Sequence, residues 1–140
     1  MKAHLHRRYH FSASHRLHVD ALSEDANREI YGKCNNPFGH GHNYSVEITV
    51  SGPVDALTGM VMDLAELDEV VQQEVVARFD MANLNLQDDF LHTVPTTENL
   101  TTKVYERLQK LVPNVKLEQV RVEETSNNTF TYAGKEEILR

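Results

Sequence analysis

The chain has 140 residues, of which 40% are hydrophobic and 25% charged, and this composition is ordinary for one globular domain. Its 21 acidic and 14 basic residues give a net charge of −7, so nucleic acid is not an expected partner. No apolar run approaches the roughly 20 residues of a membrane span, and the first residues lack the apolar stretch of a secretion signal. The single cysteine, Cys34, suits a reducing compartment. We therefore expect one cytoplasmic domain over residues 1–140, with no membrane partner.

Two strands are predicted in the first third of the chain. Apolar and polar residues alternate over about residues 9–17 and again over 40–50, the pattern of strands with one buried face. The polar segment over residues 20–27 and the segment over 32–39, which is rich in turn-forming residues, are both expected to be loops.

Two helices are predicted in the middle of the chain. Asp63 is a suitable N-cap for a helix that reaches about Arg78, with apolar residues recurring every three or four positions. A second helix is expected to begin near Thr97 and to end before Pro113.

The last part of the chain predicts a hairpin, with strands over residues 117–124 and 129–135 around a Ser126-Asn127-Asn128 turn. The element order β-β-α-α-β-β favours an α+β fold, in which two helices cover one face of a four-stranded antiparallel sheet. We expect the other face to expose apolar area unless chains associate into an oligomer.

The pattern His40-Gly41-His42 is the strongest chemical signal. Residues two apart on a strand point the same way, so both imidazoles can reach one metal ion, and His15 on the neighbouring strand can supply a third nitrogen. Three histidines with an open position are typical of catalytic zinc. The alternative is that these are hydrogen-bonded histidines without a metal. We assign no ligand role to the remaining histidines, which are His4, His6, His10, His18 and His92.

Three further side chains are candidates that also have an ordinary structural interpretation. Cys34 could be a small buried residue or a reactive thiol whose thiolate is favoured by nearby positive charge, such as that of Lys33. Asp80 could be an exposed loop acid. Glu124 could be an exposed strand acid, and only one of the neighbours Glu123 and Glu124 can face a pocket.

Five ordered blocks resemble the 6-pyruvoyltetrahydropterin synthase family, and they span nearly the whole chain. The related 6-carboxytetrahydropterin synthases share the histidines and the cysteine, but Asn-Asn-Pro ahead of the histidines is more similar to the pyruvoyl enzymes. The blocks are Phe11-Ser12-Ala13-Ser14-His15-Arg16-Leu17, Gly32-Lys33-Cys34-Asn35-Asn36-Pro37-Phe38-Gly39-His40-Gly41-His42-Asn43-Tyr44, Thr58-Gly59-Met60-Val61-Met62-Asp63-Leu64, Pro95-Thr96-Thr97-Glu98-Asn99 and Val122-Glu123-Glu124-Thr125-Ser126-Asn127-Asn128.

The resemblance implies the tunnelling fold, in which trimers close their sheets into a barrel and two trimers stack into a hexamer with sites between subunits. It also implies that His15, His40 and His42 bind zinc, which would polarise the side-chain hydroxyls of a pterin substrate. The implied activity is that of a carbon–oxygen lyase. It would convert 7,8-dihydroneopterin triphosphate to 6-pyruvoyltetrahydropterin, for tetrahydrobiopterin synthesis, with elimination of triphosphate.

The same resemblance implies roles for other residues. Cys34 matches the general base, and Glu124 matches the carboxylate that holds the guanidine-like edge of the pterin. The block Thr96, Thr97 and Glu98 matches residues near the pterin pocket, and Asp80 matches the aspartate of the proton relay.

One departure from the family pattern affects the relay. The family usually has Asp-His after the first helix, whereas this chain has Asp80-Met81. Methionine has no titratable proton, and losing a general acid–base partner commonly costs about 10²–10⁴-fold in rate. His92 is a candidate substitute.

Two classes of function therefore remain open. The first is a zinc-dependent pterin lyase. Variants of this class form 6-carboxytetrahydropterin for deazapurine (queuosine-type) synthesis or cleave the pterin side chain. The second is a catalytically weak pterin-binding protein. A structural zinc domain is disfavoured, because such sites usually have four protein ligands.

Overall fold

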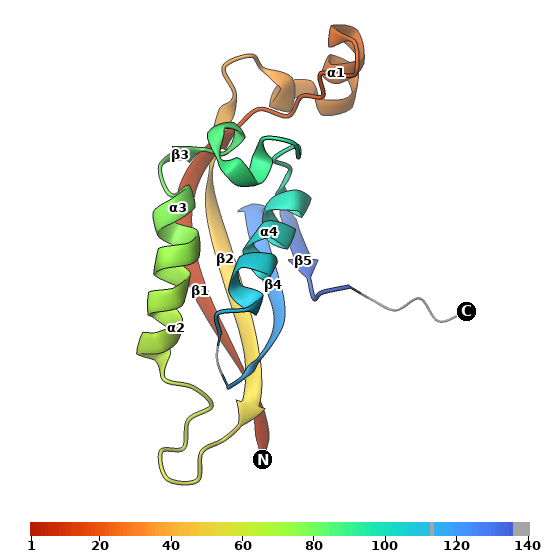
Figure 1. Ribbon diagram of the computed structural model, residues 1–140. Coiled ribbons are helices and arrows are strands. Elements are labelled where there is room, and N and C mark those ends of the chain that lie inside the picture. Colours follow the sequence, from red (N-terminus) through yellow and green to blue (C-terminus); the bar gives the residue numbers. More distant parts are fainter. Residues whose placement is uncertain (113, 136–140) are drawn as a thin grey trace, which may run out of the picture.

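A computed structural model describes residues 1–112 and 114–135 of the chain. Within them, a long curved sheet has the strand order β3-β1-β2-β4-β5 (Figure 1). Neighbouring strands run antiparallel except for β1 and β3, which are parallel. The bounds of the strands are Lys2–His15 for β1, His40–Pro53 for β2, Ala82–Asn83 for β3, Lys116–Thr125 for β4 and Asn128–Tyr132 for β5.

The expected α+β class is confirmed, but the expected four-stranded antiparallel sheet is wrong in one respect. The structure adds β3, which pairs with Ala13 and Ser14 at the end of β1 and makes the sheet mixed. Two residues are too few for an alternating pattern, so the sequence carries no strand signal there. The strand also depends on a backbone turn at Met81, whose φ is 57° and whose N–H donates to the Ser12 carbonyl at 2.6 Å.

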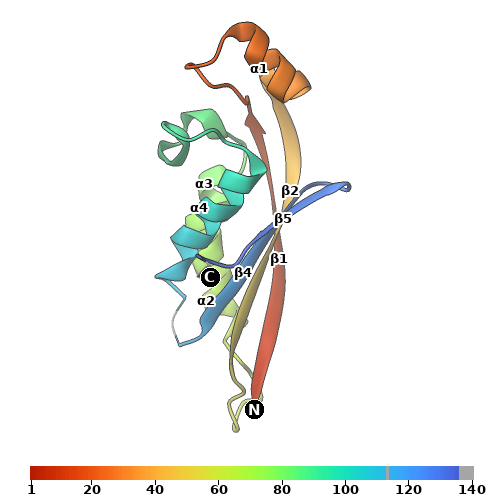
Figure 2. The same ribbon diagram turned by 90° about the vertical axis from the view of Figure 1, so that its right-hand side faces the viewer.

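Helices pack on one face of the sheet (Figure 2). One continuous helical segment contains α2 (Leu64–Val71), a π-helical turn (Gln72–Val76) and α3 (Ala77–Phe79), and the second is α4 (Thr97–Gln109). Asp63 caps α2 as predicted, because its carboxylate accepts from the Ala65 N–H at 2.9 Å. The expected helix stop at Pro113 lies outside the described residues. None of the described helices combines the length and the apolar character that a membrane crossing needs.

The core lies between this helical layer and the inner face of the sheet. Alternate residues of β1, β2 and β4 point inward and meet the apolar stripes of the helices, as the periodicity predicted. The buried side chains include Phe11, Tyr44, Val46, Ile48, Val120 and Val122 from the sheet, and Leu67, Val71, Val75, Leu100, Val104 and Leu108 from the helical layer.

The outer face of the sheet is polar, which corrects the expectation that it would expose apolar area. The outward residues of β1 and β2 form polar contacts across the strands. Arg8 contacts Glu47 at 3.0 Å, and the His6 ring lies 2.8 Å from the Thr49 hydroxyl. The sequence alternates so strictly that the inner face takes the apolar side chains. Oligomer formation stays a prediction, and exposed apolar sheet area does not support it.

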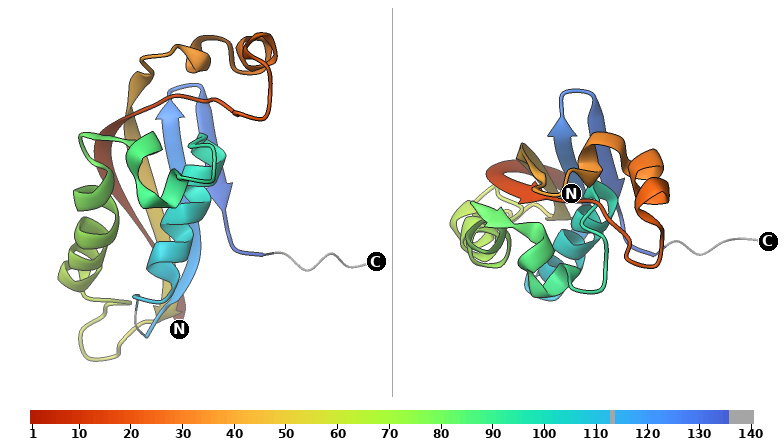
Figure 3. Two further views of the ribbon diagram at one scale, coloured as in Figure 1. Left: turned by 45° about the horizontal axis from the view of Figure 1, so that its top comes forward. Right: turned by 90° about the horizontal axis from the view of Figure 1, so that it is seen from above.

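A helical arm extends from the sheet between the end of β1 and the start of β2, where loops were expected (Figures 1 and 3). It contains α1 (Glu24–Tyr31) and a 3₁₀ turn (Gly32–Asn35). Ser23 caps α1, and fully buried Asn27 accepts from the Val19 N–H at 2.8 Å and donates to the Val19 carbonyl at 2.9 Å. The eight residues are mostly polar and the buried one is Asn27, so these caps and not the burial of an apolar face define the helix.

Several strand boundaries also differ from the prediction. β1 begins at Lys2 and not near Tyr9, because residues 2–8 pair with the end of β2 although their side chains are mainly polar. The final hairpin is confirmed, with Ser126 and Asn127 in the turn and Asn128 already in β5.

Candidate metal centre and adjoining cavity

Three histidines meet where β1 ends and β2 begins. His15 is opposite His40 in the strand register, and His42 follows two residues later on the same inward face. The ring centroids lie 4.9, 5.1 and 4.8 Å apart, with nearly perpendicular planes. One nitrogen from each ring falls within 4.8 Å of the others. The predicted convergence is therefore found, and the three rings are placed to hold one metal ion.

The hydrogen bonds of His15 define which of its nitrogens is free. Its Nδ1 lies 2.8 Å from the Pro95 carbonyl, which only accepts, so Nδ1 carries the proton and Nε2 presents a lone pair. This Nε2 is 3.2 Å from His40 Nε2. Two nitrogens on a tetrahedral zinc ion, each at 2.0–2.1 Å from it, would be about 3.3 Å apart. The spacing of this pair therefore fits a shared zinc ion.

The third ring has an unused nitrogen in the same place. His42 Nε2 is buried and has no hydrogen-bond partner among the described residues. Burial lowers the pKa of both His15 and His42, which keeps the rings neutral near pH 7. Neutral imidazoles are the form that binds metal. Such buried atoms are usually satisfied, so an unpaired ring nitrogen beside two others supports a metal site.

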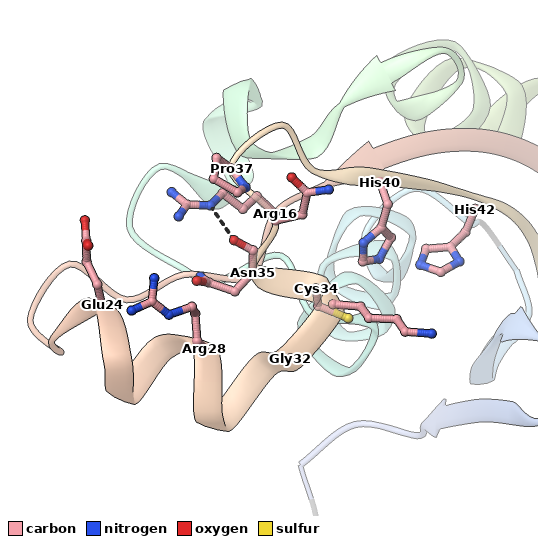
Figure 4. A pocket seen from close by; sticks show the side chains of 11 residues that line it. Arg16, Glu24, Arg28, Gly32, Cys34, Asn35, Pro37, His40 and His42 are labelled. Carbon is pink, nitrogen blue, oxygen red and sulfur yellow. Dashed lines mark hydrogen bonds between the residues drawn. The ribbon is translucent and has the colours of Figure 1, made fainter.

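Cys34 lies in the 3₁₀ turn next to this cluster. With His40 and His42 it lines a cavity of about 700 Å³ between the arm and the start of β2 (Figure 4). Burial, and then the negative charge of Glu124, raise the pKa of the thiol above its usual value. Without a metal, the shift is thus opposite to the one expected from Lys33. A divalent cation at the histidines would lower the pKa of the thiol.

Of the two adjacent acids, Glu124 points to the site. Its Oε1 lies 3.8 Å from His42 Nε2, and its Oε2 accepts a hydrogen bond from the buried Thr97 hydroxyl. Glu123, one residue earlier on β4, is exposed on the outer face. Thr97 therefore orients a carboxylate beside the histidines, and the two residues come from elements 27 positions apart in sequence.

Two residues of the predicted pterin block have other surroundings. The Thr96 hydroxyl accepts from the Asn99 N–H at 3.2 Å and caps α4. Glu98 is exposed in the first turn of α4, where the helix dipole favours an acid. Their substrate-binding roles stay predictions.

The Asp80-Met81 pair lies outside the cavity beside Cys34. Asp80 accepts from the Ser12 N–H at 2.9 Å, next to β3. Met81 is 85% exposed and borders a depression on the outer sheet face, together with Ser12, Asn43 and Asn83. His92, the candidate substitute, is exposed before α4 and does not line the cavity that contains Cys34. The relay residues and the thiol are thus not together within one chain.

Sequence reasoning missed two groups in the centre. The Pro95 carbonyl orients His15, although Pro95 was recognised only as part of a motif. Tyr44 was placed on the apolar stripe of β2. It is 1% exposed, and its hydroxyl has no hydrogen-bond partner among the described residues. Burial raises the pKa of this hydroxyl. A tyrosine two residues after a metal-binding pattern is the signal that could have identified it.

Comparisons with known proteins agree with this geometry. The profile of the family described as 6-pyruvoyl tetrahydropterin synthase matches residues 4–135. The chain is 44% identical to human 6-pyruvoyl tetrahydrobiopterin synthase, over 96% of this chain and 93% of the human one. It is 46% identical to the Drosophila melanogaster protein of the same name, over 94% and 80% of the two chains.

A solved structure shows the same fold. The Caenorhabditis elegans 6-pyruvoyl tetrahydropterin synthase superposes with a TM-score of 0.91 at 40% identity, covering 96% of this chain and 97% of the other. The match includes the segments that carry the three histidines, Cys34 and Glu124. This chain therefore belongs to the 6-pyruvoyl tetrahydropterin synthase family.

Proposed function

We propose that the chain is a zinc-dependent lyase that converts 7,8-dihydroneopterin triphosphate to 6-pyruvoyltetrahydropterin and releases triphosphate. The observation that carries the proposal is the meeting of three imidazoles, a thiol and an oriented carboxylate where β1 ends and β2 begins. Family membership supports the pterin as substrate. Triphosphate elimination with an internal hydrogen shift needs no external oxidant or reductant.

Each group has a distinct task in this reaction. A zinc ion on His15, His40 and His42 would polarise the side-chain hydroxyls of the pterin. Glu124, oriented by Thr97, accepts two N–H bonds from the pterin edge, as a carboxylate fork does. Cys34 accepts the proton from the side-chain carbon as the bond from the neighbouring carbon to the triphosphate oxygen breaks.

We expect the reaction to be slow because of Met81. The position that should carry a relay histidine holds a thioether, which neither donates nor accepts a proton at neutral pH. The backbone there is fixed by the bond from the Met81 N–H to the Ser12 carbonyl. A histidine at this position would therefore be displayed in the same exposed place.

The location of Asp80 and Met81 also supports a homo-oligomer of the hexameric type. Neither residue lines the cavity that contains Cys34, and a second subunit would bring them to that cavity. Native mass spectrometry tests this assembly. A trimer or hexamer supports it, and a monomer at micromolar concentration contradicts it.

A second function is favoured by one specific observation. With Met81 in the relay position, the protein could bind and present a pterin with little turnover. Retention of Cys34 in the cavity argues against this alternative, since storage of a ligand needs no base.

The decisive experiment measures triphosphate release by the zinc-loaded protein from dihydroneopterin triphosphate. Three variants accompany the parent. Cys34→Ala removes the base, Met81→His restores the relay group, and Met60→His places a histidine at another exposed methionine as a matched control.

The proposal predicts slow release by the parent, loss of about 10²–10⁴-fold in Cys34→Ala, and a gain of at least about tenfold in Met81→His but not in Met60→His. Binding without release in the parent, together with release by Met81→His, supports the pterin-binding alternative instead. Release that is unchanged in Cys34→Ala contradicts the lyase mechanism.

A further inference from the structure

The cavity beside Cys34 is unusual for so acidic a protein, because most of the charged residues in its lining are cations. Arg16, Arg28 and Lys33 contribute three positive charges, whereas Glu24 contributes the one carboxylate. The chain as a whole carries a net charge of −7. A concentration of cations in a cavity of about 700 Å³ indicates a site for a polyanion.

The main chain around Arg16 is held in place by amide side chains. The Arg16 N–H donates to Asn85 Oδ1 at 2.7 Å, and the Arg16 carbonyl accepts from Asn85 Nδ2 at 2.8 Å. Arg16 Nε donates to the Asn35 carbonyl at 3.2 Å (Figure 4). The two terminal guanidinium nitrogens make no hydrogen bond within the described chain, so they stay available to a phosphate group.

Arg28 reaches the cavity from the arm and is easily released from its present partner. Its terminal nitrogen contacts Asp25 three residues earlier on α1, and both side chains are largely exposed. Exposed pairs of this kind contribute little stability, so the guanidinium can exchange its carboxylate for a phosphate. Buried Asn27 fixes the helix that carries Arg28, as described above.

The order of groups along the cavity matches the order of groups along the proposed substrate. In Figure 4, His40 and His42 lie on one side, Arg28 and Glu24 lie on the other, and Cys34 lies between them. A pterin held by Glu124, with its hydroxyls at the histidines, would direct a terminal triphosphate past the thiol toward the arm. Arg28 and Arg16 therefore lie on the side toward which the leaving group would extend.

We propose that Arg28, together with Arg16 and Lys33, binds the triphosphate of the substrate and holds it as it leaves. This inference rests on the proposed function and adds its leaving-group site. The arm then has a task of its own, which is to select phosphorylated over unphosphorylated pterins. Glu24 lies beside Arg28 and repels the anion. Its neutralisation should therefore change the affinity for triphosphate in the opposite direction to neutralisation of Arg28.

The test measures binding by calorimetry, using zinc-loaded protein with Cys34→Ala so that no turnover occurs. Three probes are compared: inorganic tripolyphosphate, dihydroneopterin triphosphate and dihydroneopterin. The variants are Arg28→Gln and Glu24→Gln, and Arg121→Gln on the outer sheet face serves as the matched control for net charge.

Arg28→Gln should weaken both triphosphate probes about tenfold, the effect of losing one charged contact, and leave dihydroneopterin within twofold. Glu24→Gln should tighten the triphosphate probes, and Arg121→Gln should change none of the three. A change in the packing of the arm would not give opposite signs for two neighbouring surface residues.

The inference is overturned if Arg28→Gln binds tripolyphosphate with the same affinity as the protein that keeps Arg28. It is also overturned if Arg121→Gln weakens tripolyphosphate binding as much as Arg28→Gln does. That result leaves the lyase proposal intact wherever triphosphate release depends on Cys34. Conversely, loss of tripolyphosphate binding in Arg28→Gln supports the anion site even if the protein fails to turn over the pterin.

Discussion

The helical layer and the metal centre differ in whether their partly or fully buried polar groups have partners within the chain. In the helical layer, Asp89 accepts two hydrogen bonds from Arg107, at 2.8 and 3.0 Å, and Arg107 also contacts Glu74 at 3.1 Å. At the metal centre, His42 Nε2 and the Tyr44 hydroxyl are the buried side-chain atoms left without partners among the described residues. The first region pairs its polar groups within the fold, whereas the second leaves two polar atoms unpaired among the described residues, which supports a ligand site there.

Removal of one imidazole ring from the metal centre should have the largest effect and tests this difference most sharply. His40→Ala should reduce bound zinc from about one ion per chain to a small fraction, because two imidazoles remain. It should also abolish the rise in melting temperature that zinc gives the parent, since a ligand that binds the folded state stabilises it. Metal analysis and thermal unfolding measure both.

The matched control is His10→Ala, at an exposed histidine on the neighbouring strand β1. It should keep zinc and the zinc-dependent stabilisation. Equal zinc content in the two variants would mean that the three rings are not the metal site.

A substitution that creates a cavity in the helical layer should have the next largest effect, and it should change only the stability of the fold. Leu100 is fully buried in α4, so Leu100→Ala should reduce the free energy of unfolding by about 2–5 kcal/mol. Denaturant titration measures this loss, and zinc binding at the centre should persist. Leu86→Ala, at a 75% exposed leucine, should stay within about 0.5 kcal/mol of the parent. A similar loss in both would argue against the assigned core.

The smallest effect should come from Asp89→Asn, at about 1.5–3 kcal/mol, because one charged partner of Arg107 is replaced. The hydrogen bonds from Arg107 lower the pKa of Asp89 below its ordinary 3.8. Its stabilisation is therefore complete above pH 3.8 and is lost as pH falls through the lower folded pKa. The difference between parent and variant should shrink over that range, as measured by denaturant titration against pH.

Asp88→Asn, at the exposed neighbour, is the control and should cost little at any pH. A parent–variant difference for Asp89→Asn that does not change with acid would show that the pair with Arg107 is not what stabilises this region.

The length over which a sequence pattern repeats explains which parts of the fold were predictable. Long strands and helices with one apolar face were found because their periods repeat over many residues, as in β2 and α4. The arm was missed since α1 depends on Ser23 and Asn27, whose caps and buried bonds join residues that look like a loop. β3 was missed because two residues have no period. The polar outer face could have been read from the alternation that placed Phe11 and Val46 inward.

The candidate site was predictable to the extent that its geometry is local. His40 and His42 share a face by strand alternation alone, and the same alternation predicts that only one of Glu123 and Glu124 faces the site. Which nitrogen of His15 is free could not be predicted, because Pro95 lies 80 residues away in sequence. Likewise, the position of Arg16 beside the arm depends on bonds from its main chain to Asn85 and from its Nε to the Asn35 carbonyl, which link residues far apart in sequence.

The most direct test of the central claim is the mass of the product that the zinc-loaded protein forms from 7,8-dihydroneopterin triphosphate. We predict 6-pyruvoyltetrahydropterin with one triphosphate released per turnover, and formation of this product about 10²–10⁴-fold more slowly by Cys34→Ala. A 6-carboxytetrahydropterin, a pterin that has lost its side chain, or no product even after Met81→His would contradict it.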